Sequence, residues 1–183
     1  EVTVAERVNP YGFAPEITTN IYTIPRNIHG YLDMDGCIST CVNNEFPLHY
    51  ELLCQRLAPL YGNQKATVKV RREVDFGLYR LRGIIVRKGD FLYPAGSPKI
   101  IVRTPNTRKI GHISIYELAE AMITILQTAV GITRDGLCAE TTRVYGWQRM
   151  TQRIGASMNA ACDLLIQSGK AKEFEGKIIP TSD

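Results

Sequence analysis

An internal repeat constrains this chain more than any other feature of its sequence. Residues 53–67 match residues 137–151 at an offset of 84, with six identities in fifteen positions, where chance would give about one. Similar residues extend the register, Leu48 with Ile132 and Val70 with Ile154. The identical residues in the first copy are Leu53, Cys54, Tyr61, Gly62, Gln64 and Thr67. We therefore predict two related units of structure.

The second copy carries the signals of three helices followed by a β-hairpin. Apolar residues recur at helical spacing over 115–129 and 148–168. Ser114 and Thr133 are suited to cap the first two helices, and Gly146 to end the second. The predicted elements are helices over 115–129, 133–146 and 148–168 and a hairpin of residues 171–174 and 177–180.

The first copy repeats this order. Pro59 is expected to shorten its second helix. Pro47-Leu48-His49 leads into the second helix, which is predicted to end at Tyr61-Gly62. The other predicted elements are helices over 32–43 and 65–81 and a hairpin of residues 84–86 and 91–94. Three helices and a two-stranded hairpin are typical of a winged helix, a relative of the helix-turn-helix. The expected fold is therefore α+β, mainly α with small β-hairpin wings, arranged as tandem winged-helix repeats.

The expected domain organisation follows from the repeat. Residues 95–111 are rich in Pro, Gly, Ser, Thr and basic residues, which is typical of a linker, although Ile100 to Val102 have the character of a short strand. The predicted segments are an extended arm or linker over 1–30, a first winged-helix unit over 31–94, a linker over 95–111 and a second winged-helix unit over 112–183.

Positive charge is concentrated in the third helix and wing of each copy. The net charge is only +4, but residues 63–88 hold eight basic residues against Glu73 and Asp75. Residues 142–172 hold five basic residues against Asp163. A recognition helix meets DNA with its N-terminal residues. The predicted nucleic-acid-binding residues are Gln64, Lys65, Thr67, Lys69, Arg72, Lys88, Gln148, Arg149, Gln152 and Arg153.

Plainer interpretations of these residues remain open. Charge on a helix is commonly a solvated face, and Thr67 and Thr151 are also suited to be simple helix caps. Trp147 replaces Asn63 of the first copy and would pack between the units or stack on a base. Tyr61 and Tyr145 are expected to close each core with the hydroxyl at its edge.

The sequence offers no pattern for catalysis or for a cofactor. The three histidines are far apart, and no phosphate-binding Gly-x4-Gly-Lys-Ser/Thr loop occurs. Cys54 and Cys138 fall on apolar helix faces, and Cys37 and Cys41 lack further metal ligands. We therefore expect that the chain is not itself an enzyme and that it binds no metal, cofactor or small-molecule ligand. An odd number of cysteines without tight spacing, together with the absence of a run of about 20 apolar residues, favours a cytoplasmic protein without a membrane partner.

Several motifs resemble one bacterial family. They are Tyr61-Gly62 with the basic helix after it, Lys88 to Leu92, Ile113 to Met122, and Gly146 to Thr151. Over residues 30 to 180 the chain resembles the uncharacterised C-terminal tandem winged-helix-like domain of large proteins similar to superfamily 1 helicases, often with a restriction-endonuclease-like module. The resemblance, with the missing initiator Met, implies a fragment of a parent that acts on DNA with ATP.

Two functions are compatible with these features. The first is a non-catalytic DNA-binding accessory module of a larger helicase- or nuclease-like protein. The second is a protein-interaction or autoinhibitory module that docks on the rest of the same parent chain, which would present an exposed apolar patch instead. A hidden hydrolase has no motif behind it.

Overall fold

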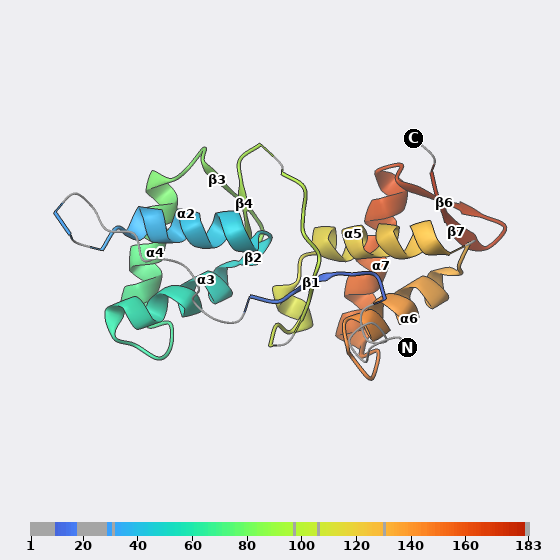
Figure 1. Ribbon diagram of the computed structural model, residues 1–183, viewed down its shortest axis with the longest axis horizontal. Helices are drawn as coiled ribbons and strands as arrows, with labels where there is room; N and C mark the ends of the chain where they lie inside the picture. Colours follow the sequence, from blue (N-terminus) through green and yellow to red (C-terminus); the bar gives the residue numbers. More distant parts are fainter. Residues whose placement is uncertain are drawn as a thin grey trace. The chain divides into compact units, whose positions relative to one another are not determined.

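The computed structural model describes residues 10–17, 29–30, 32–96, 98–105, 107–129 and 131–181. They form an α+β structure of helices with a few short strands, which confirms the expected fold class at that level. The chain divides into two compact units (Figure 1). The first unit holds the described residues within Ile17–Lys99, and the second holds those within Glu1–Glu16 and Ile100–Asp183.

The described residues of the first unit form three α-helices and a small antiparallel sheet (Figure 1). Its strands lie in the order β2-β4-β3, so the strand between the first two helices pairs with the final hairpin. The elements are α2 (Met34–Glu45), β2 (Leu48–His49), α3 (Tyr50–Leu57), the 3-10 helix η1 (Ala58–Tyr61), α4 (Val68–Arg80), β3 (Ile85–Lys88) and β4 (Phe91–Pro94).

Local sequence signals set these boundaries. Asp33 and Thr67 cap α2 and α4 by accepting hydrogen bonds from backbone N–H groups in the first turn. Pro59 starts the 3-10 turn that follows α3, and Gly62 ends it in the left-handed conformation (φ 70°). The apolar faces of the helices then bury one core, which includes Ile38, Leu53, Leu57, Val70, Val74 and Leu92.

The second unit repeats the order of three helices and a hairpin. Its elements are β1 (Ala14–Pro15), β5 (Arg103–Thr104), the 3-10 helix η2 (Ile110–His112), α5 (Ile115–Thr128), α6 (Arg134–Val144), α7 (Gln152–Gln167), β6 (Ala171–Phe174) and β7 (Lys177–Pro180). Strands β6 and β7 are antiparallel, and Ile132 forms an antiparallel bridge with Ile178 of β7. The core includes Leu118, Met122, Ile125, Leu137, Met158, Leu165 and Ile178.

Residues 84 apart occupy comparable local environments in the two units. Leu48 of β2 pairs with Leu92, and Ile132 bridges Ile178 just before α6. Gly62 and Gly146 both adopt the left-handed conformation, with φ of 70° and 74°. The matched Leu and Cys residues of the second helices, at 53, 54, 137 and 138, are all buried.

The third helices begin three to four residues later than predicted. Thr67 and Thr151 act as N-caps, so α4 starts at Val68 and α7 at Gln152, whereas the predicted starts were 65 and 148. The chain needs a turn between the left-handed glycine and the threonine cap. Four of the predicted binding residues, Gln64, Lys65, Gln148 and Arg149, therefore lie in these turns and not in the helices.

The predicted arm and linker also differ from the structure. The described residues 10–16 belong to the second unit, where β1 pairs in parallel with β5. Within the predicted linker, residues 100–111 belong to that unit as well, and Val102 and Arg103 are buried. The short strand lies at Arg103–Thr104, just after the apolar run at 100–102. The rest of the predicted arm, residues 1–9 and 18–28, falls outside the described residues.

Within the described ranges, none of the helices combines the length and the apolar character that crossing a bilayer requires.

Candidate nucleic-acid interface

The N-terminal end of α4 presents exposed polar and basic side chains. Gln64 and Lys65 are exposed in the preceding turn, and Lys69 is exposed in the first turn of the helix. Thr67 Oγ1 accepts a hydrogen bond from the backbone N–H of Val70 at 3.3 Å. Its role as a cap is therefore established, while the first backbone N–H groups of α4 have no partner within the helix.

Two predicted binding residues of α4, Lys69 and Arg72, make only weak contacts with their neighbours. Lys69 Nζ lies 5.9 Å from the centre of the Tyr61 ring, which is a long cation–π distance. Arg72 is exposed one turn further along α4, and its guanidinium lies 3.8 Å from the carboxylate of the adjacent Glu73. Both side chains remain on the surface and can turn toward a phosphate.

Other arginines of α4 are engaged in ion pairs inside the first unit. Arg71 donates two hydrogen bonds to Glu51 of α3, at 2.6 and 2.8 Å. These bonds hold the pKa of the Glu51 carboxyl below its usual range and raise that of Arg71. Arg80 makes a similar two-bond contact with Asp35 of α2. These two arginines therefore tie helices together, and part of the basic charge counted in the sequence is not available to a ligand.

The β3–β4 hairpin of the first unit also carries cations, which lie over tyrosine rings. Lys88, at the end of β3, is exposed with Nζ 5.4 Å from the Tyr93 ring. Arg87 lies over Tyr50 at 4.6 Å and 3.7 Å from the carboxylate of Asp90. The predicted binding residue Lys88 thus lies at the turn end of the β3–β4 hairpin, against a tyrosine of the same hairpin.

The N-terminal end of α7 resembles that of α4. Thr151 Oγ1 accepts a hydrogen bond from the N–H of Ile154 at 3.3 Å, the distance found for Thr67. Gln148 and Arg149 are exposed in the preceding turn, and Gln152 and Arg153 in the first turn of the helix. The guanidinium of Arg153 packs over Gly111, where an added Cβ would collide with it.

The remaining basic residues of this region are mostly paired. Arg134 contacts Asp163, Arg143 contacts Glu140 and Lys170 contacts Glu120, each at 2.6 to 2.7 Å. The described part of the chain gives Arg149 and Arg153 no such carboxylate. The same holds for Lys65 and Lys69 in the first unit. Lys65, Lys69, Arg149 and Arg153, at the beginning of the two third helices, are therefore among the described cations that have no acidic partner.

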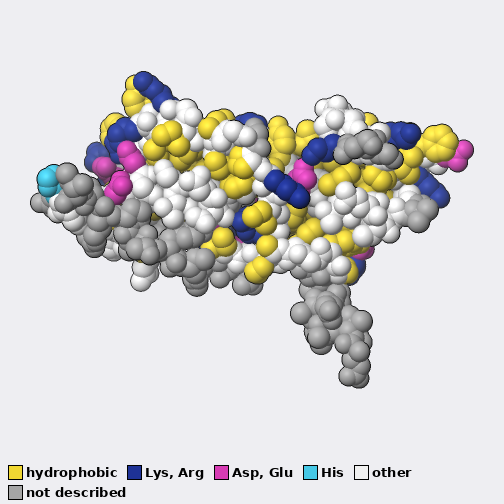
Figure 2. Space-filling view, turned by 45° about the horizontal axis from the view of Figure 1, so that its top comes forward, with side chains coloured by type: hydrophobic (Ala, Val, Ile, Leu, Met, Phe, Trp, Pro, Cys, Tyr) yellow, Lys and Arg dark blue, Asp and Glu magenta, His cyan; other side chains and the backbone are white. Residues whose placement is uncertain are grey.

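The outward face of α4 holds an apolar stripe that the sequence analysis missed. Val68, Phe76 and Tyr79 are 84%, 54% and 65% exposed. The guanidinium of Arg82 lies 4.5 Å from the centre of the Tyr79 ring. The available signal was that α4 has apolar residues outside its core positions Val70 and Val74. Figure 2 shows hydrophobic side chains interspersed with separate groups of Lys and Arg on the face that it draws.

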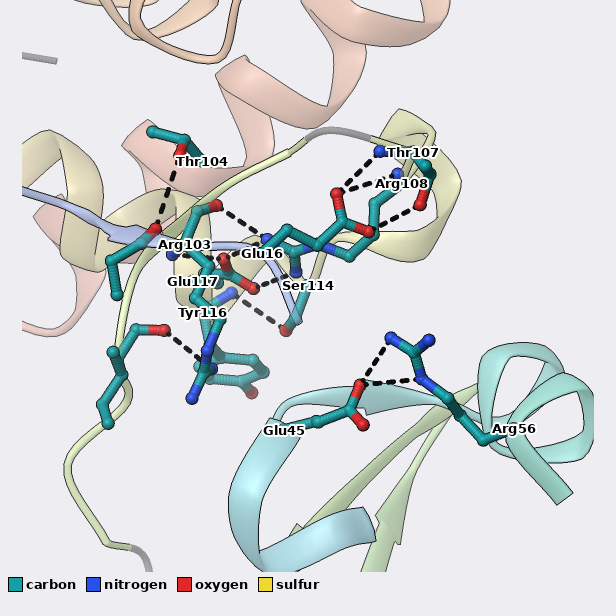
Figure 3. Close-up of polar contacts among 12 residues, drawn as sticks. Glu16, Glu45, Arg56, Arg103, Thr104, Thr107, Arg108, Ser114, Tyr116 and Glu117 are labelled. Atoms are coloured by element: carbon teal, nitrogen blue, oxygen red, sulfur yellow. Dashed lines mark hydrogen bonds and ion pairs between the residues drawn. The ribbon is translucent and has the colours of Figure 1, made fainter. Parts of the chain in front are cut away.

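A buried ion pair fastens the segment before α5 in the second unit (Figure 3). Arg108 and Glu117 have side chains that are 8% and 1% exposed, and two guanidinium nitrogens of Arg108 contact the carboxylate at 2.9 Å. Glu117 also accepts the backbone N–H of Arg103. Glu16 accepts the N–H groups of Thr107 and Arg108. These contacts hold Arg103 and Arg108 against α5 and Thr107 against Glu16, so these residues do not belong to a free linker.

Tyr145 and Trp147 both pack in or against the core of the second unit. Tyr145 and Trp147 stack with ring centres 5.1 Å apart, and Trp147 packs against the core of its own unit. The Tyr145 hydroxyl is buried without a hydrogen-bond partner among the described residues, so the expectation that it lies at the edge of the core is wrong. The reason is that the Trp147 ring stacks on Tyr145 and covers part of its side chain, which is buried to its hydroxyl end.

The cysteines and the other residues that commonly bind metal ions are placed as follows. All five cysteines are buried thiols. Burial raises the pKa of Cys41 to about 12 and that of Cys138 to about 11, so both remain protonated near neutral pH. Among the described residues no group of three His, Cys, Asp or Glu side chains is arranged to hold a metal ion.

Comparisons with known proteins add no relative. No protein-family model matches the chain, and neither a curated protein nor a solved structure does.

Proposed function

We propose that this chain is a non-catalytic nucleic-acid-binding module, with DNA as its ligand, built from two winged-helix units. Both units follow the order helix, short strand or bridge, two helices and hairpin. In the first unit the sheet order β2-β4-β3 places the early strand beside the wing. This arrangement supports the winged-helix assignment. Under that assignment α4 and α7 would be the recognition helices.

The observation that carries the proposal is that the cations at the starts of α4 and α7 have no carboxylate partner, whereas several other arginines do. Arg71, Arg80, Arg134 and Arg143 are paired with carboxylates of their own unit. Lys65, Lys69, Arg149 and Arg153 have no such partner among the described residues, and they surround the starts of α4 and α7. Helix N-termini with exposed N–H groups and cations favour phosphate.

The proposal extends to the setting of the module. The segments 88–92 and 146–151 resemble motifs of helicase-associated domains. This resemblance supports an accessory role in a larger helicase- or nuclease-like protein. The chain would then supply binding, and the rest of the parent would supply catalysis. Buried, unpaired thiols support a reducing, cytoplasmic setting.

Titration of the full chain into fluorescent duplex and single-stranded DNA at two salt concentrations tests this proposal. Affinity should fall steeply with salt, with a log–log slope of roughly −0.9 per phosphate contact on duplex. Lys65→Ala with Lys69→Ala, and Arg149→Ala with Arg153→Ala, should weaken binding and reduce that slope. Lys99→Ala removes a positive charge away from the starts of α4 and α7 and should leave binding nearly unchanged. Absence of binding at low salt would refute the proposal.

The apolar stripe of α4 favours a second candidate function, docking of a protein. Exposed Val68, Phe76 and Tyr79 are the kind of patch expected of a module that binds the rest of its parent chain. Under this alternative, nucleic-acid binding would be absent or insensitive to salt, and Phe76→Ala would weaken association with the parent instead.

A further inference from the structure

We infer that the outward stripe of α4 is a stacking surface for unpaired bases, so that the first unit binds single-stranded nucleic acid in preference to duplex. The stripe consists of Val68, Arg72, Phe76 and Tyr79. The inference rests on the proposed function and specifies its ligand.

The stripe lies on the side of α4 directed away from the core. Its residues are spaced by four, four and three positions, which places them on one helix face. Val70, Val74 and Gly77 are buried on the opposite face, against α2 and α3. The stripe therefore contributes nothing to the core of its unit, and two aromatic rings are left in water at a cost in free energy.

Cations accompany the rings along the stripe. Arg72 lies between Val68 and Phe76 in the stripe, and Arg82 lies over Tyr79. Lys69 is exposed beside Val68 in the first turn. Aromatic side chains on which bases stack, next to cations that follow the phosphates, are the usual means of binding single strands without sequence preference.

Duplex DNA fits this face poorly. In a duplex the base faces are stacked on one another, and only edges rich in hydrogen-bond donors and acceptors face the groove. Rings such as Phe76 and Tyr79 pressed against those edges would leave polar groups without partners, which is costly. An unpaired base presents its face, and an aromatic ring can cover that face without such a loss.

The matching positions of α7 in the second unit carry no such aromatic stripe. The positions 84 residues further on are occupied by Gln152, Ala156, Ala160 and Asp163. These residues of α7 offer no aromatic ring, and Asp163 is bound by Arg134. Exposed aromatics are therefore not a requirement of a third helix in this architecture, and the stripe calls for an explanation specific to the first unit.

Binding of the full chain to a fluorescent 20-nucleotide oligothymidine and to a 20-base-pair duplex tests the inference. Phe76→Ala and Tyr79→Ala should each weaken binding to the single strand by about fivefold to a hundredfold and change duplex affinity by less than about twofold. Phe76→Leu keeps an apolar side chain without the ring and should still weaken single-strand binding. Circular dichroism of each variant checks folding, which exposed positions should tolerate.

A second measurement reports on stacking directly. In Phe76→Trp, oligothymidine should quench the tryptophan fluorescence more than it quenches that of the wild-type chain, whose only tryptophan is Trp147. Single-strand affinity unchanged by Phe76→Ala and Tyr79→Ala, with Lys65→Ala and Lys69→Ala still damaging, would overturn the inference and leave the proposed function standing. The stripe would then be assigned to a protein partner. Failure of the wild-type chain to bind any oligonucleotide at low salt would refute both.

Discussion

Helices α4 and α7 hold the same place in their units, yet their outer faces differ. Both begin at a threonine cap with the same 3.3 Å bond, and both follow a left-handed glycine. Their core faces are apolar in both units. Outside, α4 carries Phe76 and Tyr79 where α7 has Ala160 and Asp163. The comparison teaches that the buried half of this helix is set by folding, whereas its exposed half differs between the units in a way that a difference in ligand would explain.

The two units also handle buried charge differently. In the second, Arg108 and Glu117 form a nearly fully enclosed pair that fastens the segment before α5. In the first, Glu45 and Arg56 are less enclosed, and Arg56 donates a further hydrogen bond to the backbone carbonyl of Ile17. The second unit is therefore expected to be the more sensitive to loss of a single carboxylate.

Glu117→Gln should have the largest effect on stability. Removal of the negative charge leaves Arg108 buried without compensation, and the free energy of unfolding of the second unit should fall by about 3 to 5 kcal/mol. Urea unfolding followed by the fluorescence of Trp147, which packs in that unit, measures the loss.

Asp163→Asn is the matched control in the same unit. Asp163 and Arg134 are 53% and 31% exposed, so their pair should contribute at most about 1 kcal/mol. Equal losses in the two variants would show that the Arg108–Glu117 pair is solvated and does not anchor its segment.

Glycine-to-alanine substitutions in the third helices should have opposite signs. At Gly77 an added Cβ collides with Cδ1 of the buried Ile38, whereas at Gly155 it lies 3.7 Å from Met150. Overpacking costs about 1 to 3 kcal/mol, and alanine gains about 1 kcal/mol over glycine inside a helix. Gly77→Ala should therefore destabilise by about 1 kcal/mol and Gly155→Ala should stabilise by about as much, as measured by urea unfolding followed by circular dichroism.

The double variant Gly77→Ala with Ile38→Val isolates the cause. Valine lacks the Cδ1 atom that the new methyl group meets, so part of the loss should be recovered. If Gly77→Ala alone proved as stabilising as Gly155→Ala, the close packing of α4 on α2 would be contradicted.

Sequence patterns predicted the helices and caps because these depend on nearby residues. Asp33 was not foreseen, but Ser114 and Thr133 cap their helices as predicted. The starts of α4 and α7 were misplaced because apolar periodicity continues into the preceding turn, where no hydrogen-bond ladder forms. The assignment of residues 10–16 and 100–111 to the second unit could not be predicted, because it depends on contacts such as that of Glu16 with Thr107, which lie 91 residues apart.

The sequence indicated which helices carry the candidate site, but not which of their side chains are exposed and unpaired. Counting cations along the chain identified the third helices. It could not tell Lys69, which remains exposed, from Arg71, which pairs with Glu51 on another helix. Nor could helical spacing alone reveal which apolar residues of α4 point outward, because α4 carries such residues on two faces. Pairing and exposure are tertiary properties, and they decide which charges a ligand can reach.

The two threonine caps should have equal and moderate effects. Thr67→Ala and Thr151→Ala each remove the acceptor for one backbone N–H and should each destabilise by about 1 kcal/mol. Serine at either position keeps the acceptor and should restore most of the loss. Urea unfolding of the single and double variants measures this, and the two losses should add because the helices belong to different units. A loss at only one position would contradict the equivalence of the two helix starts.

The smallest expected effect distinguishes a long-range ion pair from a local one. Arg71 lowers the pKa of Glu51 from another helix, and Arg143 lowers that of Glu140 from one turn away on α6. Because the folded pKa of each carboxyl lies below its ordinary value of 4.5, the stabilisation is complete above that value and is lost as the pH falls through the folded pKa. Both pairs are partly exposed, so each contributes less than about 1 kcal/mol.

Glu51→Gln should therefore destabilise measurably at about pH 7, and the destabilisation should shrink as the pH falls below 4.5 through the lowered pKa of the folded state, because the wild-type carboxyl then becomes protonated. Glu140→Gln should show the same trend at a smaller amplitude, because a pair one turn apart on one helix contributes only about 0.3 to 0.5 kcal/mol. Urea unfolding of both variants and the wild type across this pH range provides the comparison. A destabilisation by Glu51→Gln that persisted unchanged at low pH would mean that the side chain acts through packing, and that its ion pair with Arg71 does not stabilise the fold.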